Sequence, residues 1–387
     1  MFLTMNISHN LKLFITSSTI RSVGGSFLAT FATVFFYEMF DNSIEKVLLL
    51  YGALYVAFAL TAHVGAKLIA PLGMKYMMVL GIVFNTLMHI VRVFWDSNPV
   101  LHLILFILFF IIFKMLFWVP YHIELAAFTD KKKRGGQIAL LENTALGFTI
   151  IMPFLSGVFL FHFGYSAMFF IASTFALLSA IPLLKMQDTK ESYDWSIKKL
   201  VSEFFKKKNL PVVVSNIGNG IEDAVGSVIW PLFIFILLSG AYIQVGAVTT
   251  LVVISTIVLQ YLFGRLTDKI GRKKAIEYGS FLNITGWIAK IFSESFVGIY
   301  LADTYHKLGK RLNMIPFRAA IYDEAEYNMH HTDEFMVLRE TSFLIGKAFM
   351  LFVAIILIQF FSIKVTFIFA ALATFTLILA TKKVLIT

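Results

Sequence analysis

Cysteine is absent from the 387 residues, and charged residues are scarce. Without cysteine the chain can form no disulfide, no thiolate metal site and no cysteine nucleophile. Asp, Glu, Lys and Arg make up 14% of the chain, against about 25% in soluble domains. The start of the chain lacks a basic segment followed by a short apolar core and a small-residue cleavage site, so we expect no cleaved signal peptide. Hydrophobic residues reach 58% and are spread along the whole chain, which argues against a separate soluble domain.

The sequence contains many long apolar runs. A run of about 20 apolar residues can cross a hydrocarbon core of about 30 Å as a helix, and backbone facing lipid has to be helical or part of a closed barrel. The runs do not alternate as barrel strands do; residues 101–113 are an example. The sequence therefore predicts an all-α membrane protein of about twelve transmembrane helices, at 13–36, 47–70, 76–95, 100–125, 138–162, 165–186, 211–238, 242–264, 275–292, 296–321, 336–360 and 364–381.

The net charge of +10 would suggest nucleic acid in a soluble protein, but its distribution indicates membrane topology. Basic residues cluster in 131–134, 198–208 and 265–274, whereas the alternate loops 96–99, 164–165 and 239–242 contain none. This is the positive-inside pattern. We therefore expect no nucleic-acid partner, a multi-pass protein of the cytoplasmic (inner) membrane, and both termini in the cytoplasm.

One long polar stretch, 185–209, divides the predicted helices into two groups of six. We expect an N-terminal bundle at 1–186, a cytoplasmic linker at 187–209 and a C-terminal bundle at 210–387. Within the linker, apolar residues at helical spacing are flanked by lysines, which predicts an amphipathic helix on the inner leaflet, attracted by anionic lipid; binding of a partner protein is the alternative. The apolar residues are Trp195, Ile197, Leu200, Val201, Phe204 and Phe205.

The two halves resemble copies of one another. Three features recur at an offset of 196 or 198 residues: a lysine six residues before a proline and an aromatic residue, a glutamate near a helix start, and a glycine after the second helix of each half. Three matches at nearly constant offset favour duplicated six-helix halves, an architecture common among transporters. The pairs are Lys114 and Lys310, Glu142 and Glu340, and Gly73 and Gly271.

Residues 264–273 read Gly-Arg-Leu-Thr-Asp-Lys-Ile-Gly-Arg-Lys. This segment resembles the signature loop of the major facilitator superfamily, Gly-x-Leu-x-Asp-Lys/Arg-x-Gly-Arg-Lys/Arg, at every defined position. In that family the loop is usually strongest in the first half, but here residues 66–75 keep only Gly73 and Lys75 and lack the acid. We therefore expect Asp268 to face the start of the fifth helix near Glu142 and Asn143. The candidate gating residues are Gly264, Asp268, Lys269, Gly271, Arg272, Lys273, Glu142 and Glu340.

The resemblance implies two pseudo-symmetric six-helix bundles, the fold of that superfamily, and secondary transport by alternating access. It also implies that the first, fourth, seventh and tenth helices line a central cavity. Residues 153–157, Pro-Phe-Leu-Ser-Gly, match the glycine- and proline-rich motif of the family's antiporters only weakly, so they do not support a drug antiporter.

Charged residues near the middle of predicted helices are the candidate site. Each costs roughly 3 kcal/mol at a helix centre, so several of them facing lipid unpaired would exceed the net stability of a typical fold, about 5–15 kcal/mol. They must face a wet cavity or one another, and we expect Asp303 to pair with Lys307 one turn away. Lys114 and Lys310 should point toward the pseudo-twofold axis. The candidate cavity residues are Arg21, Lys114, Asn219, Glu222, Asp223, Asp303, His306, Lys307, Lys310 and Arg311.

Cations outnumber acids in this set, which favours an anionic or zwitterionic solute, with Glu222 or Asp223 as carrier of an optional coupling proton. The alternative is that the charges form fixed ion pairs between helices. We expect a monomer whose partners are a small-molecule substrate, membrane lipids and, if coupled, protons.

We expect no cofactor and no metal: the acidic residues at 323–334 fit a solvated loop better than a metal site. The sequence contains no nucleotide-binding loop and no grouping typical of a hydrolytic enzyme, so we do not expect an enzyme. The alternative function is a sensor with this fold, or a protein that handles lipids or drugs without transporting small metabolites.

Overall fold

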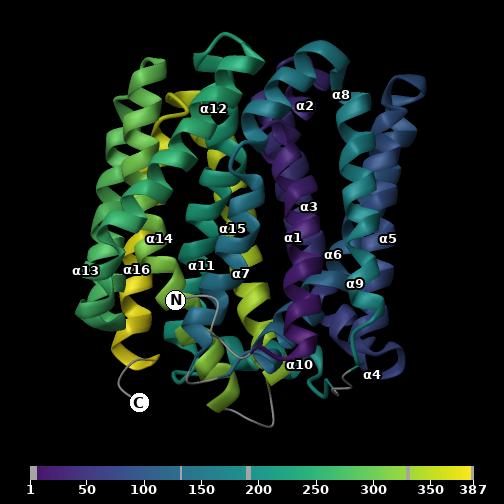
Figure 1. The fold of residues 1–387 in the computed structure, drawn as a ribbon, viewed down its shortest axis with the longest axis vertical. Coiled ribbons are helices and arrows are strands. Elements are labelled where there is room, and N and C mark those ends of the chain that lie inside the picture. Colours follow the sequence, from purple (N-terminus) through teal and green to yellow (C-terminus); the bar gives the residue numbers. More distant parts are fainter. Residues whose placement is uncertain (1–6, 131–132, 189–192, 328–331, 385–387) are drawn as a thin grey trace. The chain divides into compact units, whose positions relative to one another are not determined.

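The computed structural model describes residues 7–130, 133–188, 193–327 and 332–384. These residues form helices joined by short connections, and no strand occurs among them (Figure 1). The predicted all-α fold is therefore confirmed. The elements are α1 (His9–Ala29), α2 (Ala32–Met39), α3 (Ile44–Lys67), α4 (Ile69–Leu72), α5 (Met74–Val93), η2 (Trp95–Ser97), α6 (Pro99–Phe128), α7 (Arg134–Thr149), α8 (Met152–Leu178), α9 (Ala180–Leu184), α10 (Ile197–Phe204), α11 (Leu210–Ala224), η3 (Val225–Ile229), α12 (Trp230–Leu237), α13 (Tyr242–Ile291), α14 (Phe296–Tyr327), α15 (Thr332–Phe360) and α16 (Val365–Val384).

Single glycines turn the chain where the sequence predicted loops. Gly164 lies inside α8 with φ 73°, and Gly271 lies inside α13 with φ 76°, so each of these elements contains two helices. The sequence predicted a connection at 265–274, whereas the structure continues the helix to Gly271. Glycine adopts positive φ without a Cβ clash, which allows one residue to make the turn.

The internal repeat has counterparts in the backbone. Gly73 has φ 76° and ψ 151°, close to the 76° and 159° of Gly271. Pro120 and Pro316 both lie inside helices, in α6 and α14. These matches link positions separated by 196 or 198 residues.

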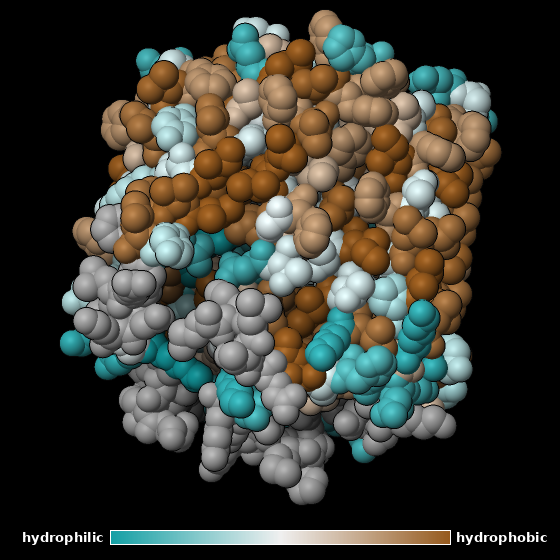
Figure 2. Space-filling view, viewed as in Figure 1, coloured by the Kyte–Doolittle hydropathy of each residue, from teal (hydrophilic) through white to brown (hydrophobic). Residues whose placement is uncertain are grey.

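Eight helical stretches among the described residues are long and apolar enough to cross a membrane. One of them, Gly136–Leu184, contains the turn at Gly164 and thus two helices. The 32-residue α14 is not among the eight, because its mid-helix charges lower its hydropathy. Hydrophobic side chains cover much of the described surface seen in Figure 2. The protein is thus a multi-pass membrane protein.

The chain forms two compact units. The first unit comprises Met1–Leu28, Ala57–Leu200 and Ala325–Glu340; the second comprises Ala29–Val56, Val201–Glu324 and Thr341–Thr387. Within the first unit α5 packs against α6, α8 and α9. Within the second, α16 packs against α11 and α13, and α2 packs against α12. The second unit thus includes α2 and the start of α3 from the first half of the sequence. The predicted division into bundles at 1–186 and 210–387 stays a prediction.

Helix α10 occupies the predicted amphipathic linker. Ile197, Val201 and Phe205 are exposed, whereas Leu200 is buried. Ile197 and Val201 lie four residues apart and share one face of the helix, and Phe205 directly follows its last residue. Glu203 is buried and contacts the ammonium of Lys206. Binding of this apolar face to lipid stays a prediction.

Within the second unit, glycines allow α11 to approach α15 closely. A Cβ at Gly220 would overlap the carbonyl oxygen of Phe343, and one at Gly346 would overlap the carbonyl oxygen of Ile217. We expect Gly220→Ala to destabilise the protein by about 1–3 kcal/mol, because the added methyl group forces the two backbones apart. Gly147→Ala is the matched control, since a Cβ at Gly147 meets nothing within 4 Å. Thermal unfolding in detergent measures both; equal melting temperatures would contradict the prediction.

Candidate functional site

A π-helical turn follows directly after the two acidic residues of α11. Glu222 and Asp223 lie in the last turn of α11, η3 begins at Val225, and α12 resumes regular geometry with Pro231 in its first turn. Proline has no backbone N–H and its ring clashes with the carbonyl four residues earlier, which explains a change of hydrogen-bond register here. Such single π turns are frequent at functional sites.

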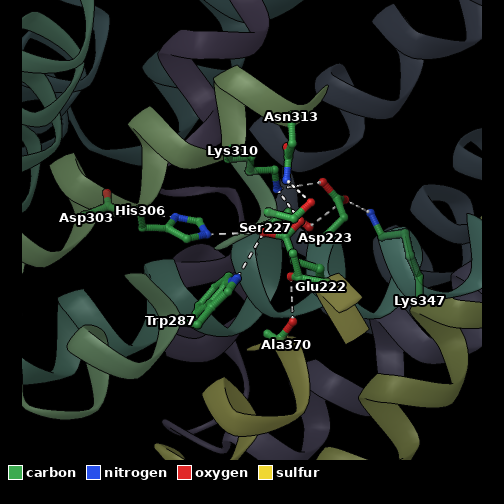
Figure 3. A network of polar contacts seen from close by, with 12 residues as sticks. Glu222, Asp223, Ser227, Trp287, Asp303, His306, Lys310, Asn313, Lys347 and Ala370 are labelled. Atoms are coloured by element: carbon green, nitrogen blue, oxygen red, sulfur yellow. Dashed lines mark hydrogen bonds and ion pairs between the residues drawn. The ribbon is translucent and has the colours of Figure 1, made fainter. Parts of the chain in front are cut away.

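Glu222 is buried and accepts contacts from three side chains on two other helices (Figure 3). Lys310 Nζ of α14 lies 2.7 Å from Glu222 Oε2. Trp287 Nε1 of α13 donates a hydrogen bond of 3.1 Å to Oε1, and His306 Nε2 of α14 lies 3.3 Å from the same oxygen. One cation and two ring nitrogens thus surround a carboxylate that would otherwise be costly to bury.

Asp223 contacts a second lysine. Lys347 Nζ of α15 lies 2.7 Å from Asp223 Oδ2, and its ammonium lies 4.3 Å from the centre of the Tyr55 ring of α3. Lys310 Nζ lies 3.9 Å from Asp223 Oδ1, so Lys310 stands between two carboxylates and is closer to Glu222. A short movement of one ammonium group would exchange its partner.

Asp303 of α14 forms a third group of contacts. Lys290 Nζ of α13 lies 2.8 Å from Asp303 Oδ1, and Lys307 Nζ lies 3.2 Å from Oδ2, which confirms the predicted pair one turn apart. Lys290 is 1% exposed and lies 4.2 Å and 4.0 Å from the ring centres of Trp230 and Trp287. Aromatic faces attract a cation, most strongly where water is excluded.

His306 joins the contacts of Glu222 to those of Asp303 and Lys290. Its Nδ1 lies 3.0 Å from Lys290 Nζ, and an ammonium group can only donate. With Lys290 charged, Nδ1 accepts and the ring proton is on Nε2, from where it is donated to Glu222 Oε1. The imidazole is then neutral and forms a hydrogen-bonded connection between two ion pairs.

We call these eight side chains the charge network. It contains four lysines, three carboxylates and one histidine from α11, α13, α14 and α15, and each acid contacts at least one lysine. This pairing is what the alternative of fixed ion pairs predicts. A pair whose members are within reach of water can also bind a solute, and the lysines of two pairs, Lys307 and Lys310, are 35% and 27% exposed. The network consists of Glu222, Asp223, Lys290, Asp303, His306, Lys307, Lys310 and Lys347.

The sequence reasoning missed two of the four lysines. Lys290 stands near the end of the predicted helix 275–292, and Lys347 lies well inside the predicted helix 336–360. The cost of a charge at a helix centre applies to Lys347 as much as to Lys114, so the same criterion would have found it. Trp287, which orients Glu222, gives no sequence signal, because tryptophan is common in membrane helices.

Four predicted cavity residues lie outside the network. Arg311 donates a hydrogen bond of 2.6 Å to Gln260 Oε1. In the first unit, Arg21 lies over the rings of Phe117, Trp118 and Tyr121, and Lys114 lies over those of Phe110, Phe113 and Trp118. Asn219 is buried one turn before Glu222 in α11. The direction of Lys114 relative to Lys310 stays a prediction.

The predicted gating residues are described in part. Arg272 forms an ion pair of 2.7 Å with Asp323, and Glu340 Oε2 lies 3.1 Å from Arg339 and 3.6 Å from His122. The side chains of 263–270, which include Gly264, Asp268 and Lys269, lie outside the described residues. The predicted approach of Asp268 to Glu142 therefore stays a prediction, as does a gating role for Lys273.

A second contact region in the second unit joins early and late parts of the sequence. Tyr242 donates a hydrogen bond of 2.5 Å to Glu38 Oε1. The ring of Tyr242 also packs edge-on against Phe31, and Tyr37 packs against Phe235. These contacts connect the end of the first predicted helix to α12 and the start of α13. They are largely aromatic, with one charge-assisted hydrogen bond.

The described residues contain no group of three or more His, Cys, Asp or Glu side chains that could hold a metal ion. In the charge network, ammonium groups stand next to carboxylate groups. A charged lysine has three N–H donors and no acceptor, so it cannot bind a metal ion. What the arrangement can do chemically is bind charged groups and move protons between hydrogen-bonded side chains.

The chain is similar to one protein-family model and to a solved structure. Residues 212–385 match the family model described as Major Facilitator Superfamily, and this range contains the whole charge network. The fold is similar to a crystal structure of the Escherichia coli fucose:proton symporter FucP, with a TM-score of 0.68 and 13% identity over 96% of this chain and 98% of that one. At that identity the likeness concerns the fold alone. No curated protein sequence matches.

Proposed function

From the premise that this chain belongs to the major facilitator superfamily, we propose that it is a secondary transporter of a small anionic or zwitterionic solute. The charge network carries the proposal. It places seven charged groups on helices of a membrane protein, and such groups are rare there and mark solute or proton pathways. Transport by alternating access would expose these groups to each side of the membrane in turn.

The net positive charge of the network supports an anionic or zwitterionic solute. Four lysines face three carboxylates, and with His306 neutral one positive charge is in excess. An anion would neutralise this excess, and a zwitterion could exchange partners with one lysine and one acid. A cationic solute would have to displace lysines from their carboxylates, which is unfavourable in a site of low dielectric.

Proton coupling follows from the position of Lys310. A proton that reaches Glu222 through His306 Nε2 removes the carboxylate charge. Lys310 then loses its partner at 2.7 Å and is attracted to Asp223, 3.9 Å away. Asp223 holds Lys347, which packs on Tyr55 of α3. Protonation at Glu222 is thereby transmitted to a contact between an early and a late helix of the sequence.

Alternating access requires that contacts between the halves of the sequence separate. The contacts of Tyr242 with Glu38 and Phe31, and of Lys347 with Tyr55, are those that opening on their side of the membrane would break. Positive-inside topology assigns the Tyr242 end to the outer side of the cytoplasmic membrane, with both termini inside. We take the working unit to be a monomer.

A thermal-shift survey followed by uptake tests the proposal. Purified protein is heated with four sets of solutes: carboxylates, amino acids, cationic amines and neutral sugars that include fucose. We expect stabilisation by members of the first two sets, and uptake of these solutes into proteoliposomes that accelerates with an inward proton gradient. Lys310→Met should abolish both effects, whereas Lys46→Met, at an exposed lysine paired with Asp41, should leave both unchanged.

Other outcomes contradict specific parts of the proposal. Stabilisation by neutral sugars or amines alone would overturn the solute class. An uptake rate that does not change with the proton gradient would overturn the proposed proton coupling at Glu222. Stabilisation by lipids with no uptake of any solute would favour a sensor or a lipid-handling protein of the same fold.

A further inference from the structure

Arg21, in the first unit, is a cation without a described counter-charge. Its guanidinium carbon lies 4.8 Å, 5.2 Å and 5.6 Å from the ring centres of Phe117, Trp118 and Tyr121. Among the described residues no carboxylate lies within ion-pair distance of it, and its buried Nε has no hydrogen-bond partner. The three rings attract the guanidinium but carry no charge, so no described group balances its positive charge.

A second unsatisfied donor lies beside it. The Nε1 of Trp118 is buried and has no hydrogen-bond partner among the described residues, and its ring is one of the three that Arg21 contacts. Buried donors are nearly always paired in folded proteins, and leaving one unpaired destabilises the fold, more so if it is charged. Two such donors next to each other indicate that an acceptor is missing.

The second unit shows the same pair of donors with the acceptor present. There a lysine and an indole N–H, those of Lys310 and Trp287, both contact the carboxylate of Glu222, at 2.7 Å and 3.1 Å. Around Arg21 and Trp118 the cation and the indole N–H are present, and the carboxylate is not among the described side chains. An oxyanion from outside the chain would complete the arrangement.

We propose that Arg21 and Trp118 form a binding site for an oxyanion, the carboxylate or phosphate group of the transported solute. The planar guanidinium offers two parallel N–H groups to such a group, and the indole N–H adds a third donor. The rings of Phe117 and Tyr121 cover the guanidinium and fix its plane. The identity of the ligand as the transported solute rests on the proposed function; the site itself does not.

Stability of the ligand-free protein gives the first test. Arg21→Met removes an unbalanced charge and keeps an apolar side chain against the rings, so we expect the melting temperature to rise by a few degrees, as is common when a binding group is removed. Trp118→Phe removes only the N–H and should leave the melting temperature unchanged or slightly raised. If Arg21 instead has a structural role, Arg21→Met lowers the melting temperature, and that result overturns the proposal.

Binding of simple oxyanions gives the second test. Sodium benzoate, sodium acetate and inorganic phosphate are titrated against sodium chloride at equal ionic strength, with thermal stabilisation as the readout. We expect saturable stabilisation by the carboxylates, by phosphate or by both, and the pattern identifies the group. The apparent Kd should rise at least about tenfold in Arg21→Met and by a smaller factor in Trp118→Phe, as expected for lost charge-assisted and neutral hydrogen bonds. Lys46→Met should bind as the parent does.

The two tests separate this inference from the proposed function. Stabilisation by none of the three anions, or equal stabilisation of the parent and Arg21→Met, overturns the site even if the protein transports a solute. Binding that depends on Arg21, in a protein that takes up no solute in proteoliposomes, supports the site and overturns the transport function.

Discussion

Lys290→Met is expected to lower the free energy of unfolding by about 3–5 kcal/mol, because it leaves Asp303 as a buried charge without its nearest partner. Asp303 is 2% exposed and Lys290 is 1% exposed, so water cannot replace the ammonium at 2.8 Å. Lys307, at 3.2 Å and 35% exposed, compensates only in part, because a partly exposed partner offsets less of the cost of the buried carboxylate. The substitution further removes the cation packed between Trp230 and Trp287. Loss of the monomeric peak on size exclusion and a lowered melting temperature in detergent measure the effect.

The matching double substitution separates the charge from its position. In Lys290→Met with Asp303→Leu, both members of the pair become apolar, and replacing a buried ion pair by apolar residues of similar size is often neutral. We expect the double variant to recover most of the lost stability. A double variant as unstable as Lys290→Met would show that packing between the tryptophans, rather than the unpaired carboxylate, causes the loss.

Glu222→Gln is expected to reduce solute uptake by about 10- to 100-fold, the equivalent of losing one charge-assisted hydrogen bond. Glutamine keeps the shape of the side chain and can still accept from Trp287 and His306, but it carries no charge to hold Lys310. Lys310 then pairs with Asp223, and the step that depends on exchange between the two acids is lost. Initial uptake rates in proteoliposomes, with the solute found in the survey, measure the effect.

Two further variants define what the Glu222 result means. Glu222→Asp keeps the charge on a shorter side chain and should retain more activity than Glu222→Gln. If Glu222 carries the coupling proton, Glu222→Gln should slow solute counterflow without a proton gradient less than it slows gradient-driven uptake. Equal loss of counterflow and of driven uptake would assign Glu222 to solute binding or to structure instead.

The helical membrane fold could be read from the sequence because the bilayer imposes it. Lipid offers no hydrogen-bond partner to the backbone, so any apolar run long enough to span it has to be helical. The turns at Gly73, Gly164 and Gly271 were likewise near their predicted places, since glycine tolerates positive φ. The connection predicted at 265–274 differs in the structure. The helix that contains the signature segment continues to Gly271, because this one glycine makes the turn for which a loop was expected.

Which side chains meet was decided by tertiary structure. Glu222 contacts Trp287 and His306, 65 and 84 residues away, and Asp223 contacts Lys347, 124 residues away. Such pairs depend on which face each helix presents to its neighbours, and a sequence of nearly uniform hydrophobicity leaves that rotation unspecified. The sequence required only that Glu222, Asp223 and Asp303, placed within predicted membrane helices, have partners that compensate their charge.

The sequence by itself determined that charges inside the membrane had to be compensated, because each carries a desolvation cost that lipid cannot offset. Only the folded chain decided how. In the second unit helix packing brings four lysines to three acids, and it places Arg311 beside Gln260 instead. In the first unit it surrounds Arg21 with aromatic rings. The physical reason is that the energy of a charge depends on its neighbours within a few ångströms, and those neighbours come from distant parts of the sequence.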